Sequence, residues 1–266
     1  MTPVPADIAG AIRLAQPRLG PLAAPLVFYA SIGSTNDAAA SLAEEGAVVI
    51  ADEQTAGRGR RGRAWFSPPG SGLYVSVVLR PARARADPRR ATMLVTLAAG
   101  VAIAEGIGAS TGLAVDLKWP NDVHVSERKV AGILAEAAHD TVVLGYGINL
   151  RAASYPAELR DRATSLESAT GRSVDRAPVL VETLAALARR YGDLLDGRFD
   201  AILDAWRALA PAAVGRGVRW TSASREQSGV RSGVTAGIDD HGALLVRTDG
   251  GIERIVAGEV EWVEKP

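Results

Sequence analysis

An arginine-rich segment is the first part of this sequence whose residue types could do chemistry. Residues 57–63 read GRGRRGR, and Gly57, Gly59 and Gly62 spell the G-x-G-x-x-G pattern of a dinucleotide-binding turn. That turn needs a strand before it and a helix after it, because the helix N-terminus binds the pyrophosphate. The apolar run AVVIA precedes the segment, but AWFSPPGSG follows it, and its prolines exclude a helix. We therefore reject dinucleotide binding, and a P-loop is absent because no Gly-Lys pair occurs.

The overall composition limits what these arginines can bind. The 30 Lys and Arg residues balance the 30 Asp and Glu residues, so no global positive field exists to hold nucleic acid. The absence of cysteine excludes disulfides, thiolate nucleophiles and thiolate metal sites, and it agrees with a cytoplasmic location. The histidines, His124, His139 and His241, lack metal-ligand spacing, and we assign them no metal or base role.

Length and hydrophobic content describe an ordinary globular protein. The 266 residues, of which 47% are hydrophobic and 23% charged, can form one large domain and a small module. The N-terminal segment MTPVPADIAG lacks the basic start and apolar core of a signal peptide. We find no apolar run of membrane-spanning length and expect no membrane association.

Local patterns predict alternating strands and helices in the first half of the chain. Residues 1–25 are rich in proline and predict no defined element. Ser34 or Thr35 is a suitable N-cap, and Gly46 a suitable stop, for a short helix. An Ala-rich segment with apolar residues at helical spacing predicts a longer helix. The predicted strands lie at 26–31, 47–51 and 73–80, and the longer helix at 90–109.

The second half begins with closely spaced strands, which must pair antiparallel because a parallel crossover needs about a dozen residues. These strands are predicted at 113–119, 123–125, 129–137 and 141–150, and helices follow at 176–196 and 199–209. From Val214 onward, short strands between Gly, Asp and Ser turns predict a small β-barrel. The expected fold is α+β, with a mixed, largely antiparallel sheet and flanking helices in domain 1–212 and the barrel in domain 213–266.

Several motifs in order carry a family resemblance that covers the chain from about residue 27 to the end. They are GSTN at 33–36, EQTAGRGRRGRAWFSP at 53–68, KWPND at 118–122, KVAGIL at 129–134, GYGIN at 145–149 and a C-terminal GID…GEV pattern. Together they resemble the biotin protein ligase family. The resemblance implies a catalytic core similar to that of class II aminoacyl-tRNA synthetases and an SH3-like C-terminal barrel.

The resemblance also implies a two-step reaction and its partners. Members of the family join biotin to ATP, release pyrophosphate, and transfer biotin from biotinyl-5'-AMP to a lysine of a carrier domain. The implied cofactors are ATP, biotin and Mg²⁺, and the implied partner is the biotin carboxyl carrier domain of acetyl-CoA carboxylase or of another biotin-dependent carboxylase. The first step brings two anions together, so fixed positive charge at that point lowers its barrier.

The resemblance assigns residues to each part of this reaction. Catalytic roles fall to Lys129, Arg60, Arg58 and Asp122. The implied biotin site consists of Ser34, Thr35, Asn36, Gln54, Gly57, Arg58, Gly59, Arg60, Lys129 and Gly132. The implied ATP site consists of Arg60, Arg63, Trp65, Asn121, Asp122, Lys129 and Asn149, with Asp122 as a ligand of Mg²⁺. We expect the glycine-rich loop to order over its ligand and exclude water.

Considered without the resemblance, the same residues allow plainer interpretations. Ser34 and Thr35 suit a helix N-cap, and the arginines suit a solvated basic loop. Trp65, which the resemblance makes a stacking platform for adenine, could equally pack in the core. The PND triplet could be a plain turn and Lys129 a solvated strand end.

Two other functions compete with biotin ligation. A lipoate ligase, or a ligase for a related carboxylic acid, could use the same scaffold, although the GRGRRGR loop is of the biotin type. An RNA-binding module could use the arginines, although the zero net charge argues against it. About 25 residues precede the first predicted strand, too few for a winged helix, so we expect a ligase that binds no nucleic acid. We expect a monomer or weak homodimer, and we note Tyr146 where the family resemblance suggests a small or aliphatic residue.

Overall fold

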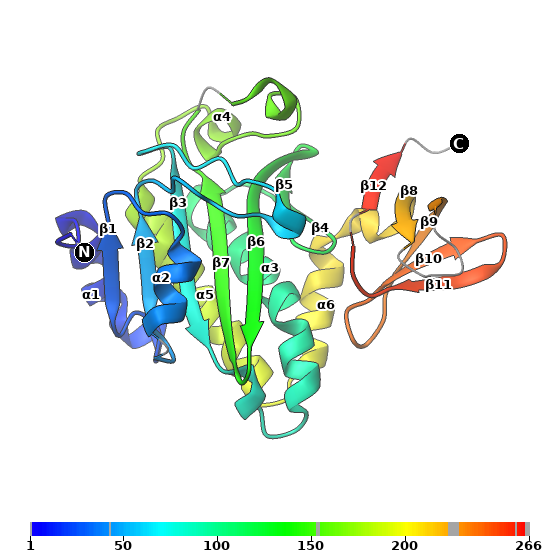
Figure 1. Cartoon of the computed structure of the whole chain (residues 1–266), viewed down its shortest axis with the longest axis horizontal. Coiled ribbons are helices and arrows are strands. Elements are labelled where there is room, and N and C mark those ends of the chain that lie inside the picture. The colour runs from blue at the N-terminus through cyan, green and yellow to red at the C-terminus, as the bar shows by residue number, and fades with distance from the viewer. Residues whose placement is uncertain (1, 43, 153–154, 223–228, 259, 264–266) are drawn as a thin grey trace.

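The protein folds around two β-sheets that follow one another along the chain (Figure 1). The structure, a computed structural model, describes residues 2–42, 44–152, 155–222, 229–258 and 260–263. The first sheet has seven strands and is packed with helices, and the second has five strands. Helix α6 (Phe199–Leu209) and a short 3₁₀ turn, Pro211–Ala213, connect them. The domain boundary near residue 212 stays a prediction.

The first sheet is mixed, as expected, with strand order β1-β2-β3-β7-β6-β5-β4. Strands β1 and β2 run parallel, joined by helix α2 (Thr35–Leu42), and the other neighbours pair antiparallel. The strands are β1 (Leu26–Tyr29), β2 (Val48–Ala51), β3 (Gly72–Leu79), β4 (Asp116–Lys118), β5 (Asp122–Val125), β6 (Arg128–Ala138) and β7 (Thr141–Asn149). Each predicted strand of this half is therefore present, within a few residues at its ends.

The N-terminal segment forms a helix that the sequence did not predict. Helix α1 (Ala6–Leu19) buries Ile8, Ile12 and Leu19, which lie on one face at helical spacing. Pro5 precedes the helix, where its missing N–H group costs nothing, while Pro17 lies in the last turns. The prolines suggested an irregular segment, but burial of the apolar face against the core stabilises the helix.

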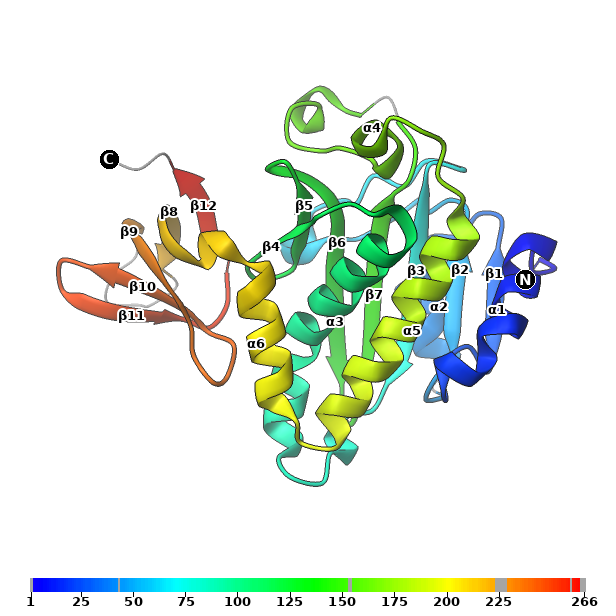
Figure 2. The same cartoon turned by 180° about the vertical axis from the view of Figure 1, so that it is seen from behind.

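The two faces of the seven-stranded sheet have different coverings. Helices α3 (Pro88–Thr111) and α5 (Arg176–Leu195) pack on one face, as Figure 2 shows from behind, and α2 lies on the other. The α2 face also carries the arginine loop, with a short 3₁₀ turn at Arg60–Gly62. The remaining short elements are α4 (Leu166–Thr170) and 3₁₀ turns at Pro81–Arg83 and Ala157–Leu159.

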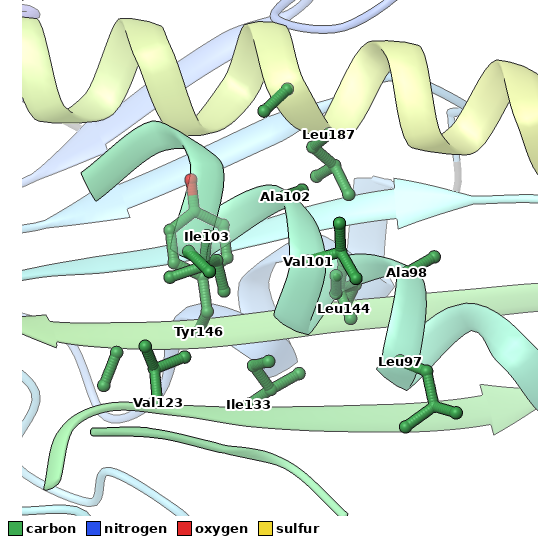
Figure 3. Packing of buried hydrophobic residues seen from close by; sticks show 14 of the residues in the cluster. Leu97, Ala98, Val101, Ala102, Ile103, Val123, Ile133, Leu144, Tyr146 and Leu187 are labelled. Atoms are coloured by element: carbon green, nitrogen blue, oxygen red, sulfur yellow. The ribbon is translucent and has the colours of Figure 1, made fainter. Parts of the chain in front are cut away.

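The side chain of Tyr146 points to the helical face of the sheet (Figure 3). It packs among Ile103, Leu144 and their neighbours, and its hydroxyl lies 3.4 Å from that of Thr183 on α5. Side chains alternate between the faces of a strand, so Gly145 and Gly147 face the other way. The large residue in GYGIN is thus a core residue and does not enter the opposite face.

Helix α3 corrects the expectation that no segment is long enough to span a membrane. By length and mean hydropathy it could cross one, but 72% of its most apolar window is buried inside the protein. Its buried residues pack against α5, α6 and the sheet. An all-round apolar helix in this position is a core helix.

The C-terminal sheet is antiparallel, with strand order β11-β10-β9-β8-β12. Its strands are β8 (Val214–Ser222), β9 (Gly229–Ile238), β10 (Leu244–Thr248), β11 (Gly251–Ile255) and β12 (Val260–Val263). Polar contacts fasten it beside β4: Trp119 donates to the Gly242 carbonyl at 2.9 Å, and Arg216 pairs with Glu127 at 3.1 Å. The Trp262 ring lies near Lys118, Arg216 and His124.

The close crossing of α3 and α5 yields a test of the packing. A methyl group added to Gly106 would lie 2.5 Å from the Thr183 backbone, whereas one added to Gly108 would lie 3.5 Å from its nearest neighbour, the Leu113 carbonyl. We expect Gly106→Ala to destabilise the protein by about 1–3 kcal/mol through overpacking. Gly108→Ala should be neutral or gain up to about 1 kcal/mol from helix propensity. Urea unfolding of both variants checks this, and equal midpoints would contradict the packing.

Candidate active site

Three glycines leave a strip of β6 and β7 without side chains on the α2 face. Gly132 and Gly147 are directly paired across the two strands, and Gly145 lies two residues before Gly147. A methyl group on Gly132 would lie 2.8 Å from the Trp65 ring, and one on Gly147 would collide with the Trp65 indole nitrogen. One on Gly145 would collide with the Asn36 amide oxygen. The bare backbone is therefore the floor on which Trp65 and Asn36 lie.

The predicted polar residues around this floor form a continuous hydrogen-bond chain. The amide oxygen of Gln54 accepts from the Thr35 backbone N–H at 2.9 Å and from the Thr35 hydroxyl at 3.0 Å. The Gln54 amide nitrogen donates to Ser67 at 3.1 Å. The hydroxyl of Ser76 lies 2.8 Å from the Thr35 hydroxyl and 2.6 Å from the Asn36 amide oxygen. The structure thus joins Ser34, Thr35, Asn36 and Gln54 in one small pocket.

Ser67 and Ser76 belong to this pocket's framework but were missed by the sequence analysis. Ser76 is completely buried in β3, within the apolar run LYVSVVL. Because a buried hydroxyl needs a partner, a single serine in such a run was a signal that could have been used. The Thr35 hydroxyl bonds to Gln54 across the pocket, so the structure uses it there in preference to capping α2.

Arg58 lies at the outer edge of the pocket, between two carboxylates. Its guanidinium donates to both oxygens of Asp37 at 2.7 Å and to Glu136 at 3.0 Å. The hydrogen bond from Arg58 lowers the pKa of Asp37, and the same contact raises the pKa of Arg58. Glu136 also accepts from the Asn36 amide at 2.6 Å. Arg58 lines the pocket but not the larger cavity that contains Lys129.

Trp65 separates this pocket from a second, larger cavity. The pocket has a free volume of about 40 Å³ and the cavity about 330 Å³, and Trp65 and Gly59 line both. The Trp65 backbone N–H donates to the Gly57 carbonyl at 2.8 Å, and a methyl group on Gly57 would press on Trp65 and Ser67. Within the described residues, the buried indole nitrogen has no hydrogen-bond partner. The Trp65 ring, which lies against Gly132, therefore forms the wall between the pocket and the cavity.

The larger cavity gathers the cationic residues predicted to act in catalysis. The Lys129 ammonium pairs with Asp122 at 2.6 Å and lies 5.2 Å from the centre of the Trp65 ring. Arg60 and Arg63 line the same cavity. Backbone hydrogen bonds fix Lys129, whose N–H donates to Arg162 and whose carbonyl accepts from Thr164. Lys129 is thus held at the cavity, and the interpretation as a solvated strand end is wrong.

The side-chain amides of Asn121 and Asn149 form hydrogen bonds that connect the segments around the cavity. The Asn121 nitrogen donates to the Ile133 carbonyl at 2.8 Å, and its oxygen accepts from Arg60 at 3.3 Å. The Asn149 nitrogen donates to the Thr164 carbonyl at 3.0 Å. The PND triplet is therefore a turn that also faces the cavity, and its role in ATP binding stays a prediction.

The C-terminal sheet completes one side of the cavity. Arg60 donates to the Gly258 carbonyl at 3.2 Å, and Val260 lines the cavity. His124 is buried below Trp262, and its burial lowers its pKa. Within the part of the chain that the structure describes, no three His, Asp or Glu side chains gather as a metal-binding group. Three carboxylates line the cavity, those of Asp122, Glu127 and Asp161, and the assignment of Asp122 to Mg²⁺ stays a prediction.

Comparison with known proteins decides the family. Residues 29–150 match the biotin/lipoate A/B protein ligase family, and residues 215–262 match the biotin protein ligase C terminal domain. The bifunctional ligase/repressor BirA of Bacillus spizizenii is 39% identical over 247 residues, covering 89% of this chain and 73% of that protein. The biotin--[acetyl-CoA-carboxylase] ligase of Paracoccus denitrificans is 36% identical, covering 85% and 96%. This chain belongs to the biotin protein ligase family.

A solved structure agrees with the sequence comparisons. The biotin protein ligase from Aquifex aeolicus in complex with biotin and ATP superposes with a TM-score of 0.77 and 30% identity, covering 90% of this chain and 99% of that one. The family resemblance drawn from the ordered motifs is confirmed. The roles of individual residues in this family member stay predictions. The structure shows only which of these residues lie in the same pocket or cavity.

The glycine floor yields a test of the Trp65 position. Gly147→Ala adds a methyl group where the indole lies, so the ring must leave the floor. We expect increased quenching of tryptophan fluorescence by acrylamide and a stability loss of about 1–3 kcal/mol. In a Trp65→Leu background the same substitution should leave quenching unchanged. Unaltered quenching with Trp65 present would show that the indole does not occupy this floor.

Proposed function

We propose that this chain is a biotin protein ligase that uses the small pocket for the biotin ring and the larger cavity for ATP. One observation carries the proposal. A pocket lined by neutral amides and hydroxyls, and by Arg58 paired with two carboxylates, adjoins a cavity lined by Lys129, Arg60 and Arg63, with Gly59 and Trp65 between them. This arrangement suits a ligand with a neutral polar ring at one end and a carboxylate at the other.

The reaction requires positive charge where the two ligands meet. A carboxylate oxygen of biotin attacks the α-phosphorus of ATP, and the bond to the β-phosphate oxygen breaks to release pyrophosphate. Lys129 and Arg60 line the cavity together with Gly59 and Trp65, which border both spaces, and they would offset the charge of both anions. A carrier lysine amine then attacks the acyl carbon, AMP leaves, and an amide forms.

The phosphate chain and its cation would occupy the rest of the cavity. Arg63 and Asn121 face that space, and Asp122 supplies a carboxylate oxygen of the kind that Mg²⁺ prefers. Bound Mg²⁺ would neutralise part of the phosphate charge. Asp122 also fixes Lys129, because the two side chains form an ion pair at 2.6 Å.

Pocket chemistry favours biotin over lipoate. Asn36 and Gln54 contribute amide groups, and Thr35 a hydroxyl, to a pocket whose floor is the glycine backbone of β6 and β7. The cyclic urea of biotin carries two N–H donors and a carbonyl acceptor that can pair with them. The dithiolane ring of lipoate carries neither, so it would leave these polar groups unpaired at a cost.

The RNA-binding alternative fits the arginine loop poorly. Arg58 is occupied by Asp37 and Glu136, and Arg60 by Asn121 and the Gly258 carbonyl. Both guanidinium groups therefore already bind protein groups of the site, and the chain as a whole has no net charge. We continue to propose that the protein binds no nucleic acid and acts in the cytoplasm.

The acceptor is a biotin-carrying protein domain, and we propose that it docks on the free edge of β6. Pairing between β5 and β6 ends at Gly132 among the described residues, while β6 continues to Ala138. The Ile133 N–H and carbonyl both bond to Asn121, away from β7. Backbone groups alternate along a strand, so those of Ala135 and Ala137 also point outward, where an added strand could pair.

The carrier itself is proposed to be that of acetyl-CoA carboxylase or another biotin-dependent carboxylase. The name of the Paracoccus denitrificans relative specifies acetyl-CoA carboxylase as the acceptor enzyme of that protein. Because the β6 edge could also pair with a second copy of itself, we propose a monomer or a weak homodimer in solution.

Removal of Lys129 tests the proposed chemistry. We expect Lys129→Met to lower kcat for biotin- and ATP-dependent pyrophosphate release by about 10²–10³-fold, because a charge at the developing bond is lost. Arg128→Met is the matched control, since Arg128 is adjacent on β6 but exposed. Its rate should be unchanged. A Lys129→Met enzyme with full activity, or a wild-type chain that activates lipoate and not biotin, would overturn the proposal.

A proline on the β6 edge tests the docking surface. Ala137→Pro removes an outward N–H that makes no ladder bond to β7, so the fold should tolerate it. We expect adenylate formation to be unchanged and transfer to an apo carrier domain to fall by about 10-fold, since a docking hydrogen bond and its register are lost. Ala137→Thr keeps the N–H and should transfer normally. Equal transfer rates for the two variants would exclude strand pairing at this position.

A further inference from the structure

Glu136 lies outside the motifs that identify the family, yet its carboxylate joins two residues of the pocket. One oxygen of Glu136 accepts from the Asn36 amide at 2.6 Å and from Arg58 at 3.0 Å. The side chain is 43% exposed, on the part of β6 that lies beyond its pairing with β5. Its position at the pocket edge places it behind Asn36 and Arg58, so it acts through them.

The contact with Asn36 determines which way that amide faces. Asn36 is 5% exposed and has two different ends, an oxygen that accepts and a nitrogen that donates. Ser76 donates to the oxygen at 2.6 Å, and Glu136 accepts from the nitrogen. A carboxylate can only accept, so it excludes the flipped amide, which would turn its oxygen toward Glu136. The remaining hydrogen and lone pair of Asn36 are thereby fixed in direction.

The contact with Glu136 also offsets part of the charge of Arg58 and holds its side chain at the pocket edge. Arg58 meets two carboxylates, Asp37 and Glu136, so its charge is already offset before any ligand binds. It lines the small pocket and bridges α2 and β6 there, at a distance from the cavity of Lys129. Among the loop arginines, Arg60 and Arg63 face the reacting anions, whereas Arg58 closes the outer edge of the ring pocket.

We propose that Glu136 is a positioning residue for recognition of the biotin ring. This inference rests on the proposed function and specifies one part of it. Glu136 orients the Asn36 amide toward the cyclic urea and holds Arg58 across the pocket edge, without contacting the reacting carboxylate or phosphate. Its loss therefore weakens biotin binding and leaves the chemical step at saturating biotin intact.

Binding and kinetics of variants at three carboxylates, beginning with Glu136, test this assignment. We expect Glu136→Ala to raise the Kd and KM for biotin by about 10–100-fold, the usual effect of removing a partner that orients a ligand-binding group. The kcat at saturating biotin and the KM for ATP should change by less than about 2-fold. Glu136→Gln can still accept from Asn36 through its amide oxygen, and it should recover most of the affinity.

Two matched carboxylates serve as controls. Asp37→Ala removes the other partner of Arg58 but does not touch Asn36, so it should weaken biotin binding less than Glu136→Ala does. Asp140 lies on the turn between β6 and β7, 60% exposed and outside the pocket, so Asp140→Ala should behave as the wild type.

The outcomes separate failure of the inference from failure of the function. A wild-type chain that binds no biotin would refute the proposed function. A wild-type chain that binds biotin, together with Glu136→Ala binding within about 2-fold of it, would refute only the role of Glu136. A Glu136→Ala variant that loses kcat with an unchanged KM for biotin, or an Asp37→Ala variant with an equal loss of affinity, would also overturn the orientation of Asn36 as the cause.

Discussion

The close approach of side chains to the bare backbone of β6 and β7 is the constraint on which the site depends. Gly132, Gly145 and Gly147 leave room for Trp65 and Asn36 to lie against the strands, and any side chain at these positions would collide with them. Trp65 then separates a small polar pocket from a larger cationic cavity. The core on the opposite face, where Tyr146 and α3 pack, makes this floor rigid. Rigid elements hold binding groups more accurately than loops do.

The arginines of the loop point to different parts of the site because each one binds different partners. Arg58 turns toward Asp37 and Glu136 at the edge of the pocket, whereas Arg60 turns toward Asn121, Gly258 and the cavity. The loop is a tight hairpin in which Arg58 and Ala64 form a bridge, and Gly62 adopts a positive φ of 73° at its turn. One loop thus places Arg58 at the small pocket and Arg60 and Arg63 at the larger cavity. The C-terminal sheet contributes to this division through the Gly258 carbonyl.

The strands, the main helices and the family were accessible from sequence because each rests on local pattern. The short spacing between the strands of the meander required antiparallel pairing, and the helices at α3, α5 and α6 begin and end close to the predicted residues. The N-terminal helix was missed because its prolines obscured an apolar face that only burial against the core makes stable. The sequence predicted α3 as a helix from its apolar residues at helical spacing. That spacing does not show that the whole helix is long and apolar enough to span a membrane.

The sequence by itself determined the order of the motifs, the strands and the main helices, and therefore the family and its chemistry. Tertiary structure alone decided which residues of different motifs touch. Ser76 and Glu136 became part of the pocket only when β3 and β6 brought them to Thr35 and Asn36, and the segment before β3 brings Ser67 to Gln54. Likewise Arg58 and Arg60, two residues apart, were separated into different sites by the partners that face them. The physical reason is range: periodicity and capping act within one element, whereas hydrogen bonds and ion pairs between elements depend on how the sheet is assembled.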